Sequence, residues 1–319
     1  MTTFPKSTCV ACGSSRLAAL RAKDYMSSQP ETFLYAECQD CRTTFLNQAI
    51  EDLASCYPAG YYSLQSPHMG VRYRATNAIL RLMLAVGLPR KKTLQLLPNL
   101  SPYYFLRAYS IRHDARILDV GSGTGRFVHR LGEVGYRNAR GIDPYIPRDV
   151  QFDNGTSVTK CTLEKSDGRA DVIFFNHSLE HVSDPLESLR QAAIALLPSG
   201  FIVVRIPLAA SLAAGLFGTS WWQFDAPRHV TLFSARGFRA VAEGLGLAIQ
   251  EVVFDSAGHV FGRSMSNVIR QQSLTSEHMR ELAAATRKLC PGFRKMAVAL
   301  NHCGLADQAM FILRRKGDV

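Results

Sequence analysis

The most telling absence in this sequence is that of acidic residues between Asp52 and Asp114. Eight basic residues fall in that interval: Arg72, Arg74, Arg81, Arg90, Lys91, Lys92, Arg107 and Arg112. They account for much of the formal net charge of +11. A surface of one sign attracts anions. The interval therefore predicts either contact with nucleic acid, a phosphate-linked substrate or an anionic membrane, or merely a solvated basic helix face.

Long apolar runs are also missing. A membrane-spanning helix needs roughly 18 consecutive apolar residues, and the nearest candidate, Ala78–Leu88, is shorter and contains Arg81. The first residues, MTTFPKSTCVAC, lack the apolar core of a secretory signal. We therefore expect a soluble, cytoplasmic protein without a transmembrane segment, for which peripheral membrane contact stays open. The sequence does not indicate an oligomeric state.

Half of the eight cysteines occur in two C-x-x-C units, Cys9–Cys12 and Cys38–Cys41. In a cytosolic chain, paired units of this kind indicate a metal more than disulfides. Two knuckles complete a closed, tetrahedral four-cysteine site, so the expected role is a structural Zn²⁺. The sequence thus predicts a zinc ribbon over residues 1–46. The alternative is a set of four buried or redox-active thiols.

The run Ile117–Gly125, ILDVGSGTG, leads an apolar segment into three alternating glycines, and a helix-like segment follows. Such a turn brings backbone close to a nucleotide. The third glycine comes one residue too early for the dinucleotide fingerprint G-x-G-x-x-G. Asp119, two residues before the first glycine, suits a ligand with cationic amino and sulfonium groups. Asp143 ends the next apolar segment and can accept hydrogen bonds from both ribose hydroxyls.

Strands and helices alternate over residues 114–254. The predicted strands are Arg116–Val120, Arg140–Asp143, Thr156–Thr159, Asp171–Asn176 and Phe201–Ile206, with a helix over Pro185–Leu196. Further strands are expected over Leu247–Phe254 and Ala309–Lys316. This alternation implies a parallel sheet with right-handed crossovers and a ligand at the carboxyl ends of the strands.

The glycine turn resembles the first motif, (D/E)-x-G-x-G-x-G, of class I S-adenosylmethionine-dependent methyltransferases. The resemblance implies an α/β, Rossmann-like, doubly wound seven-stranded sheet that ends in an antiparallel pair. It implies S-adenosyl-L-methionine as cofactor, with the glycines under its methionine part. The residues that it assigns to the cofactor are Asp119, Gly121, Ser122, Gly123, Gly125, Asp143, Pro144, Leu163, Asn176, His177 and Tyr61.

The segment after the predicted strand Asp171–Asn176 reads His177-Ser-Leu-Glu180-His181. It looks like the fourth-strand motif of small-molecule methyltransferases related to ubiquinone-biosynthesis O-methyltransferases, where it lines the gap between methyl donor and acceptor. An acceptor oxygen or nitrogen must lose a proton, and His181 is the first candidate for the base. Alternatively, Glu180 and His181 only orient the loop. A third interpretation is a divalent-metal site formed by His177, Glu180 and His181.

Both tryptophans lie in the segment Trp221–His229, WWQFDAPRH. The segment resembles the W-x-x-x-D-x-P-R-H stretch of the same family, and the resemblance implies a lid over the acceptor pocket. His229 is the second candidate base. Arg228 either binds an anionic or hydroxylated acceptor or makes a structural ion pair.

Three parts are therefore predicted: the zinc ribbon (1–46), a basic helical connector and cofactor cap (47–113), and a methyltransferase domain (114–319) with a lid insertion at 208–236. The predicted function is methyl transfer, at oxygen, to a small-molecule or glycan acceptor such as a sugar, nucleotide sugar or natural product. One alternative is an RNA methyltransferase whose ribbon and connector grip phosphate, although the Asn/Asp-Pro-Pro-Tyr motif is missing. The other is a non-catalytic, cofactor-binding assembly protein.

Overall fold

The computed structural model describes residues 5–27, 31–57, 70–94, 97–166, 168–271 and 276–318. Its central sheet is built from β4 (Ile117–Val120), β5 (Ala139–Ile142), β6 (Val150–Gln151), β7 (Ser157–Thr159), β8 (Ala170–Asn176), β9 (Leu196–Pro207), β11 (Leu247–Phe254) and β12 (Gln308–Arg315). The strand order is β11-β12-β9-β8-β4-β5-β7-β6. Strands β7, β5, β4, β8 and β9 are parallel, and β11 and β12 form the expected antiparallel pair. The predicted seven strands are confirmed, and β6 adds a two-residue edge strand.

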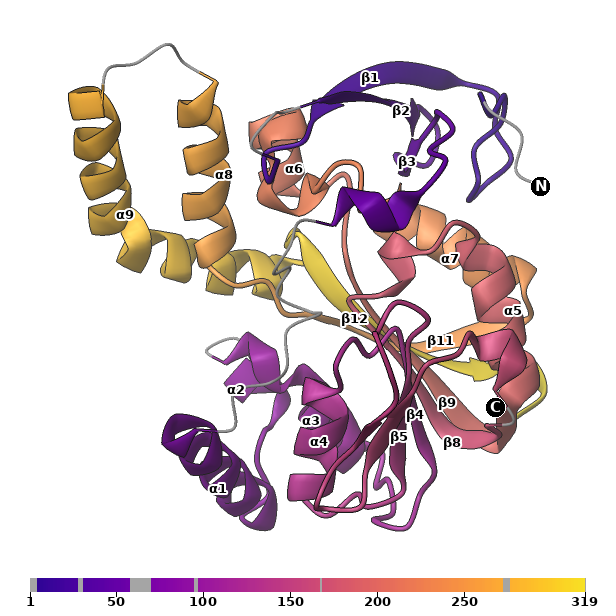
Figure 1. Cartoon of the computed structure of the whole chain (residues 1–319). Helices are drawn as coiled ribbons and strands as arrows, with labels where there is room; N and C mark the ends of the chain where they lie inside the picture. The colour runs from indigo at the N-terminus through magenta and orange to yellow at the C-terminus, as the bar shows by residue number, and fades with distance from the viewer. Residues whose placement is uncertain are drawn as a thin grey trace.

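Helices cover both faces of this sheet (Figure 1). One face carries α5 (Pro185–Ala195) and α7 (Ala235–Gly244), and the other carries α3 (Ser101–Ala108) and α4 (Arg126–Glu133). Along β8, Ile173 and Phe175 belong to the first core, whereas Val172 and Phe174 belong to the second. Burial on both faces explains why the strand is a continuous apolar run. The predicted doubly wound fold is confirmed.

The predicted boundary between Pro185–Leu196 and the following strand is displaced. The helix ends at Ala195, and β9 already begins at Leu196, five residues before the expected Phe201. Leu196 pairs with Ala170, and the register then shifts so that Phe201 pairs with Val172. The residues between them, including Pro198 and Gly200, form an irregularity within the strand instead of a loop before it.

The N-terminal strands β1 (Leu17–Lys23), β2 (Thr32–Cys38) and β3 (Thr44–Leu46) form a second, antiparallel sheet. This sheet takes its fourth strand, β10 (Thr231–Leu232), from the end of the predicted lid, in the order β1-β2-β3-β10. The N-terminal segment is thus hydrogen-bonded to the lid. Where the domain boundaries fall stays a prediction.

The described residues form five further α-helices. They are α1 (Val71–Ala85), α2 (Lys91–Leu94), α6 (Leu212–Phe217), α8 (His259–Arg270) and α9 (Ser276–Cys303). Figure 1 shows α8 and α9 side by side. The rings of Phe261 and Phe293 stack between these two helices. Within the described residues 97–113 of the predicted connector, α3 is the one α-helix. None of the helices in the described ranges has the length and apolarity needed to span a membrane.

Candidate active site

The glycine turn connects β4 to α4 at the carboxyl edge of the sheet. Gly121, Gly123 and Gly125 all have left-handed φ angles, of 72°, 54° and 87°. A Cβ on Gly121 would lie 2.5 Å from the Cβ of Ser178, and one on Gly125 would lie 2.5 Å from a methyl group of Val158. Both the backbone conformation and the close neighbours therefore require glycine here.

Two carboxylates flank this turn. One oxygen of Asp143 accepts a hydrogen bond from the Gly123 amide (2.8 Å), and the other accepts one from the Tyr145 amide (2.8 Å). Asp119 is 3% exposed, and its Oδ1 has no hydrogen-bond partner among the described residues. Burial, with a contribution from the charge of Asp143, raises the pKa of Asp119 well above its usual value. Such an unsatisfied buried acceptor beside a glycine cradle fits a ligand that brings a cationic group.

The other residues assigned to the cofactor follow strands at the same edge. Ser122 lies in the turn itself, Pro144 follows Asp143 after β5, and Asn176 ends β8. Leu163 opens the 3₁₀ turn η3 (Leu163–Lys165) after β7. The structure thus gathers these predicted residues around the ends of β4, β5, β7 and β8. Tyr61 lies outside the described residues.

His177 follows β8 and is held by a chain of polar contacts. Its Nε2 accepts a hydrogen bond from Nη1 of Arg205 (2.8 Å), so the ring proton is assigned to Nδ1, 3.6 Å from Oε1 of Glu180. Arg205 in turn donates from Nε to Oδ2 of the fully buried Asp255 (2.6 Å). Because Nε2 accepts from Arg205 and Nδ1 carries the proton, His177 has no free lone pair to offer a metal.

His181 and His229 face each other edge to face, with ring centroids 4.6 Å apart. His181 Nδ1 lies 3.1 Å from the carbonyl of Arg228, and His229 Nδ1 lies 2.8 Å from the carbonyl of Gln223. Because a carbonyl only accepts, each ring carries its proton on Nδ1 and keeps a lone pair on Nε2. Desolvation, helped by the neighbouring His229, lowers the pKa of His181 to about 4, so its ring is neutral at pH 7.

Tyr57 is a site residue that the sequence reasoning missed. Its hydroxyl lies 3.0 Å from Nδ1 of His181, 124 positions along the chain. Burial, with smaller contributions from nearby charges, raises the pKa of the Tyr57 phenol, which stays neutral. No motif marks Tyr57 in the sequence, since only the fold brings the end of η1 (Leu53–Cys56) to this loop.

Glu180 lies in the 3₁₀ turn η4 (Leu179–His181) and is 1% exposed, with no hydrogen-bond partner for either oxygen among the described residues. Burial opposes its ionisation, but His177, His181 and His229 outweigh burial and lower its pKa to about 2. Ligand atoms of Glu180, His181 and His229 all lie within 4.8 Å of one another. Two imidazoles and a carboxylate could hold a divalent metal ion. The structure thereby replaces His177, in the predicted metal group, by His229.

The structure gives Arg228 the role of a structural ion pair. The side chain is 1% exposed and binds both oxygens of Asp24 (2.7 and 3.0 Å) together with Oδ1 of Asp225 (2.7 Å). It also donates to the carbonyl of Cys56 (2.9 Å). This cluster fastens the predicted lid to the N-terminal sheet.

The lid is fixed to the body of the molecule as well. The buried indole of Trp221 donates from Nε1 to Oδ2 of Asp307 (2.8 Å), and the Tyr35 hydroxyl donates to the His229 carbonyl (2.9 Å). His229 therefore sits on a segment that is held from both sides. Such support holds an imidazole in one orientation.

The four cysteines form the second candidate centre. Cys9 and Cys41 approach to 3.5 Å between sulfurs, Cys12 and Cys38 approach to 3.6 Å, and all four sulfurs lie within 4.8 Å of one another. The amide of Ala11 points at the Cys9 sulfur (3.4 Å), and that of Cys41 points at the Cys38 sulfur (3.5 Å). The donor set and its spacing fit a closed tetrahedral zinc site.

Comparison with known proteins gives one family match. The model of a methyltransferase domain family matches residues 88–252. A curated tRNA U34 carboxymethyltransferase from Syntrophotalea carbinolica is 34% identical over 101 residues, which is 28% of this chain and 31% of that protein. The chain therefore matches about a third of the length of this relative.

Solved structures resemble the chain more weakly. One is the 1,6-didemethyltoxoflavin-N1-methyltransferase from Burkholderia thailandensis with bound S-adenosylhomocysteine (13% identity, 92% of this chain and 99% of that chain, TM-score 0.44). Another is the geranyl diphosphate C-methyltransferase from Streptomyces coelicolor (15% identity, 68% and 79%, TM-score 0.41).

Proposed function

Because the chain belongs to the methyltransferase domain family, we propose that it transfers a methyl group from S-adenosyl-L-methionine to a small-molecule or glycan acceptor, at oxygen. The cofactor assignment rests on the buried carboxyl group of Asp119, whose Oδ1 has no hydrogen-bond partner among the described residues, beside the three left-handed glycines. The proposed acceptor site is the polar cluster of Glu180 and His181, which follow β8, and His229, which lies in the predicted lid.

Residues at the carboxyl edge would hold the cofactor in two places. Asp119 would take the cationic amino group, which restores a partner to its buried oxygen. The Asp143 oxygens already accept amide hydrogen bonds but keep a second lone pair each, which ribose hydroxyls can use. The remaining predicted contacts are Gly121, Ser122, Gly123, Gly125, Pro144, Leu163, Asn176 and His177, and they stay part of this proposal.

The sulfonium supplies an already activated methyl group, so the protein mainly aligns the acceptor with it. His181 is the first candidate for the base because its ring is neutral at pH 7 with a lone pair on Nε2. His229 is the second, since its Nδ1 is likewise held by a carbonyl. Tyr57 and the Arg228 carbonyl would fix the orientation of His181.

The proposal includes one structural metal ion, and a second ion is the alternative to the free base. Cys9, Cys12, Cys38 and Cys41 would bind a structural Zn²⁺. Glu180, His181 and His229 would bind a divalent ion in place of a free base. When bound there, such an ion would lower the pKa of an acceptor hydroxyl. Activity that survives chelation while the ribbon keeps its zinc would favour the free base.

A second candidate function is RNA methylation. It is favoured by the match to a tRNA-modifying relative and by the acid-free interval between Asp52 and Asp114. Protein that neutralises several phosphates releases counterions, so RNA affinity would fall steeply with salt. A flat salt dependence of binding to bulk tRNA would remove this candidate.

The acceptor can be tested with S-adenosylmethionine that carries a labelled methyl group. Wild-type protein is incubated separately with nucleotide sugars, with extracted glycolipids and with bulk tRNA, and label is counted in each pool. The proposal expects label in a sugar-containing pool and none with a Gly123→Val variant. Label in tRNA alone would assign the second function, and label in no pool would support a non-catalytic role.

A further inference from the structure

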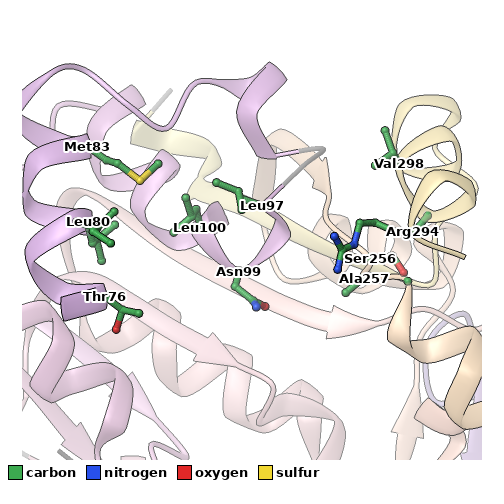
Figure 2. Close-up of a pocket in the computed structure, with 13 residues that line it drawn as sticks. Thr76, Leu80, Met83, Leu97, Asn99, Leu100, Ser256, Ala257, Arg294 and Val298 are labelled. Carbon is green, nitrogen blue, oxygen red and sulfur yellow. The ribbon is translucent and has the colours of Figure 1, made fainter. Parts of the chain in front are cut away.

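A cavity of about 500 Å³ lies between α1 and α9, outside the cluster described above. Figure 2 shows its two walls: Leu80 and Met83 of α1 with Leu100 on one side, and Ala257 with Val298 of α9 on the other. Most of the lining side chains are apolar. Volume and lining are those of a small-molecule site.

Among the described residues that line this cavity, one is charged. Arg294 of α9 lines the cavity, and its side chain makes no ion pair within the described ranges. The other polar lining residues, Thr76, Asn99 and Ser256, are uncharged. The site therefore offers an apolar interior and one positive group, which is complementary to a molecule with a hydrocarbon body and an anionic head.

The outer face of α1 continues the apolar surface of the cavity. On one side of α1, Tyr73 and Asn77 face α4. Tyr73 is hydrogen-bonded to His129, and Asn77 accepts a hydrogen bond from Arg130. The opposite side of α1 exposes Val71 (84%), Ile79 (58%) and Leu82 (65%). Ile79 also lines the cavity, so an exposed apolar stripe adjoins its wall. Exposed apolar side chains that line up in this way mark interaction surfaces.

We propose that this cavity binds the hydrocarbon chain of an anionic amphiphile, whose head lies at Arg294. A chain of contacts links the cavity to the candidate active site. The lining residue Ser256 follows Asp255, Asp255 pairs with Arg205, and Arg205 donates a hydrogen bond to His177. The inference rests on the cavity and its charge, and it does not depend on methyl transfer.

A chain-length series tests the proposal on the full-length protein. Hexyl, octyl, decyl and dodecyl phosphate are titrated calorimetrically below their micelle-forming concentrations, with inorganic phosphate as the reference. Each methylene buried in the cavity should strengthen binding about fourfold, corresponding to about 0.8 kcal/mol. The gain in affinity per methylene should stop once the alkyl chain fills the cavity. Absence of binding, or affinity that does not depend on chain length, would overturn the proposal.

Matched variants test where the hydrocarbon chain and the anionic head of the amphiphile bind. Val298→Trp fills the cavity from α9 and should weaken dodecyl phosphate at least tenfold, whereas Leu289→Trp, on an exposed part of α9, should not. Arg294→Gln should weaken binding about two- to fivefold because the pair is exposed to water. Lys295→Gln, the neighbouring exposed cation, should change nothing. Equal losses in a variant and its control would contradict the assigned site. Melting curves of all four variants identify any that fails to fold.

Discussion

Asp119 has a buried carboxyl group whose pKa lies well above its usual value, because burial and Asp143 disfavour the charge. A cationic ligand favours the charged form, so binding releases a proton. Affinity for S-adenosylmethionine should therefore rise, up to tenfold per pH unit, between the ordinary carboxyl pKa and the raised one, and then level off.

Calorimetry at a series of pH values checks this linkage. Asp119→Asn should weaken binding and flatten the pH profile, whereas Asp153→Asn, at an exposed position, should reproduce the wild-type profile. An unchanged profile in Asp119→Asn would show that another group titrates.

His181 gives a second prediction at this scale. If it is the base, activity needs its neutral form, and its lowered pKa of about 4 keeps that form populated well below pH 6.5. The acid limb of kcat/KM should therefore follow a pKa near 4, below the ordinary histidine value. His181→Ala should lower kcat by about 10²–10⁴-fold, while His278→Ala on exposed α9 should not. Activity whose acid limb persists unchanged in His181→Ala would point to another base, of which His229 is the second candidate.

Arg228 gives a prediction about stability. Its guanidinium is buried between Asp24 and Asp225. Arg228→Met would leave both carboxylates buried without their cation, and we expect a loss of about 3–5 kcal/mol in the free energy of unfolding. Urea denaturation measures it, with Arg239→Met on the exposed side of α7 as the control. A loss equal to that of the control would mean that the cluster adds no net stability.

At the scale of elements, the N-terminal strands and the lid share one sheet through the pairing of β3 with β10. Loss of zinc should therefore disturb the lid as well as the ribbon. Cys38→Ser should release about one zinc per chain, and the apparent zinc contribution to folding is about 10–16 kcal/mol in zinc-finger peptides.

Tryptophan fluorescence reports the lid, because both tryptophans lie within it. In Cys38→Ser the emission should shift to the red as the buried Trp221 becomes hydrated, and Cys290→Ser should serve as the unchanged control. A wild-type protein without zinc by elemental analysis would refute the zinc centre.

The elements were predictable where local chemistry decides them. The glycine turn, β8 and α5 follow from left-handed glycines, a continuous apolar run and a capping Asp184 before Pro185. The start of β9 was not predictable, since Pro198 and Gly200 read as a loop and only the pairing of Leu196 with Ala170 makes this segment a strand.

At the scale of the whole molecule, the parts of the site that sequence reasoning missed are long-range contacts. Tyr57 reaches His181, and Asp24 reaches Arg228 across 204 positions. Neither pair is marked in the sequence by a motif or by a characteristic spacing. His229 could be named from its local segment, but its approach to Glu180 depends on how the lid packs against β8. Motif residues were therefore predictable, and their mutual arrangement was not.

The central claim is that residues around the glycine turn bind S-adenosylmethionine. Calorimetric titration of this cofactor into wild-type protein and into Gly123→Val tests it most directly, because valine cannot adopt the left-handed φ of 54° without strain. We predict one-to-one binding by the wild type and none by the variant, with both proteins folded by circular dichroism. A wild type that does not bind the cofactor, or a folded variant that binds it equally well, would contradict the account.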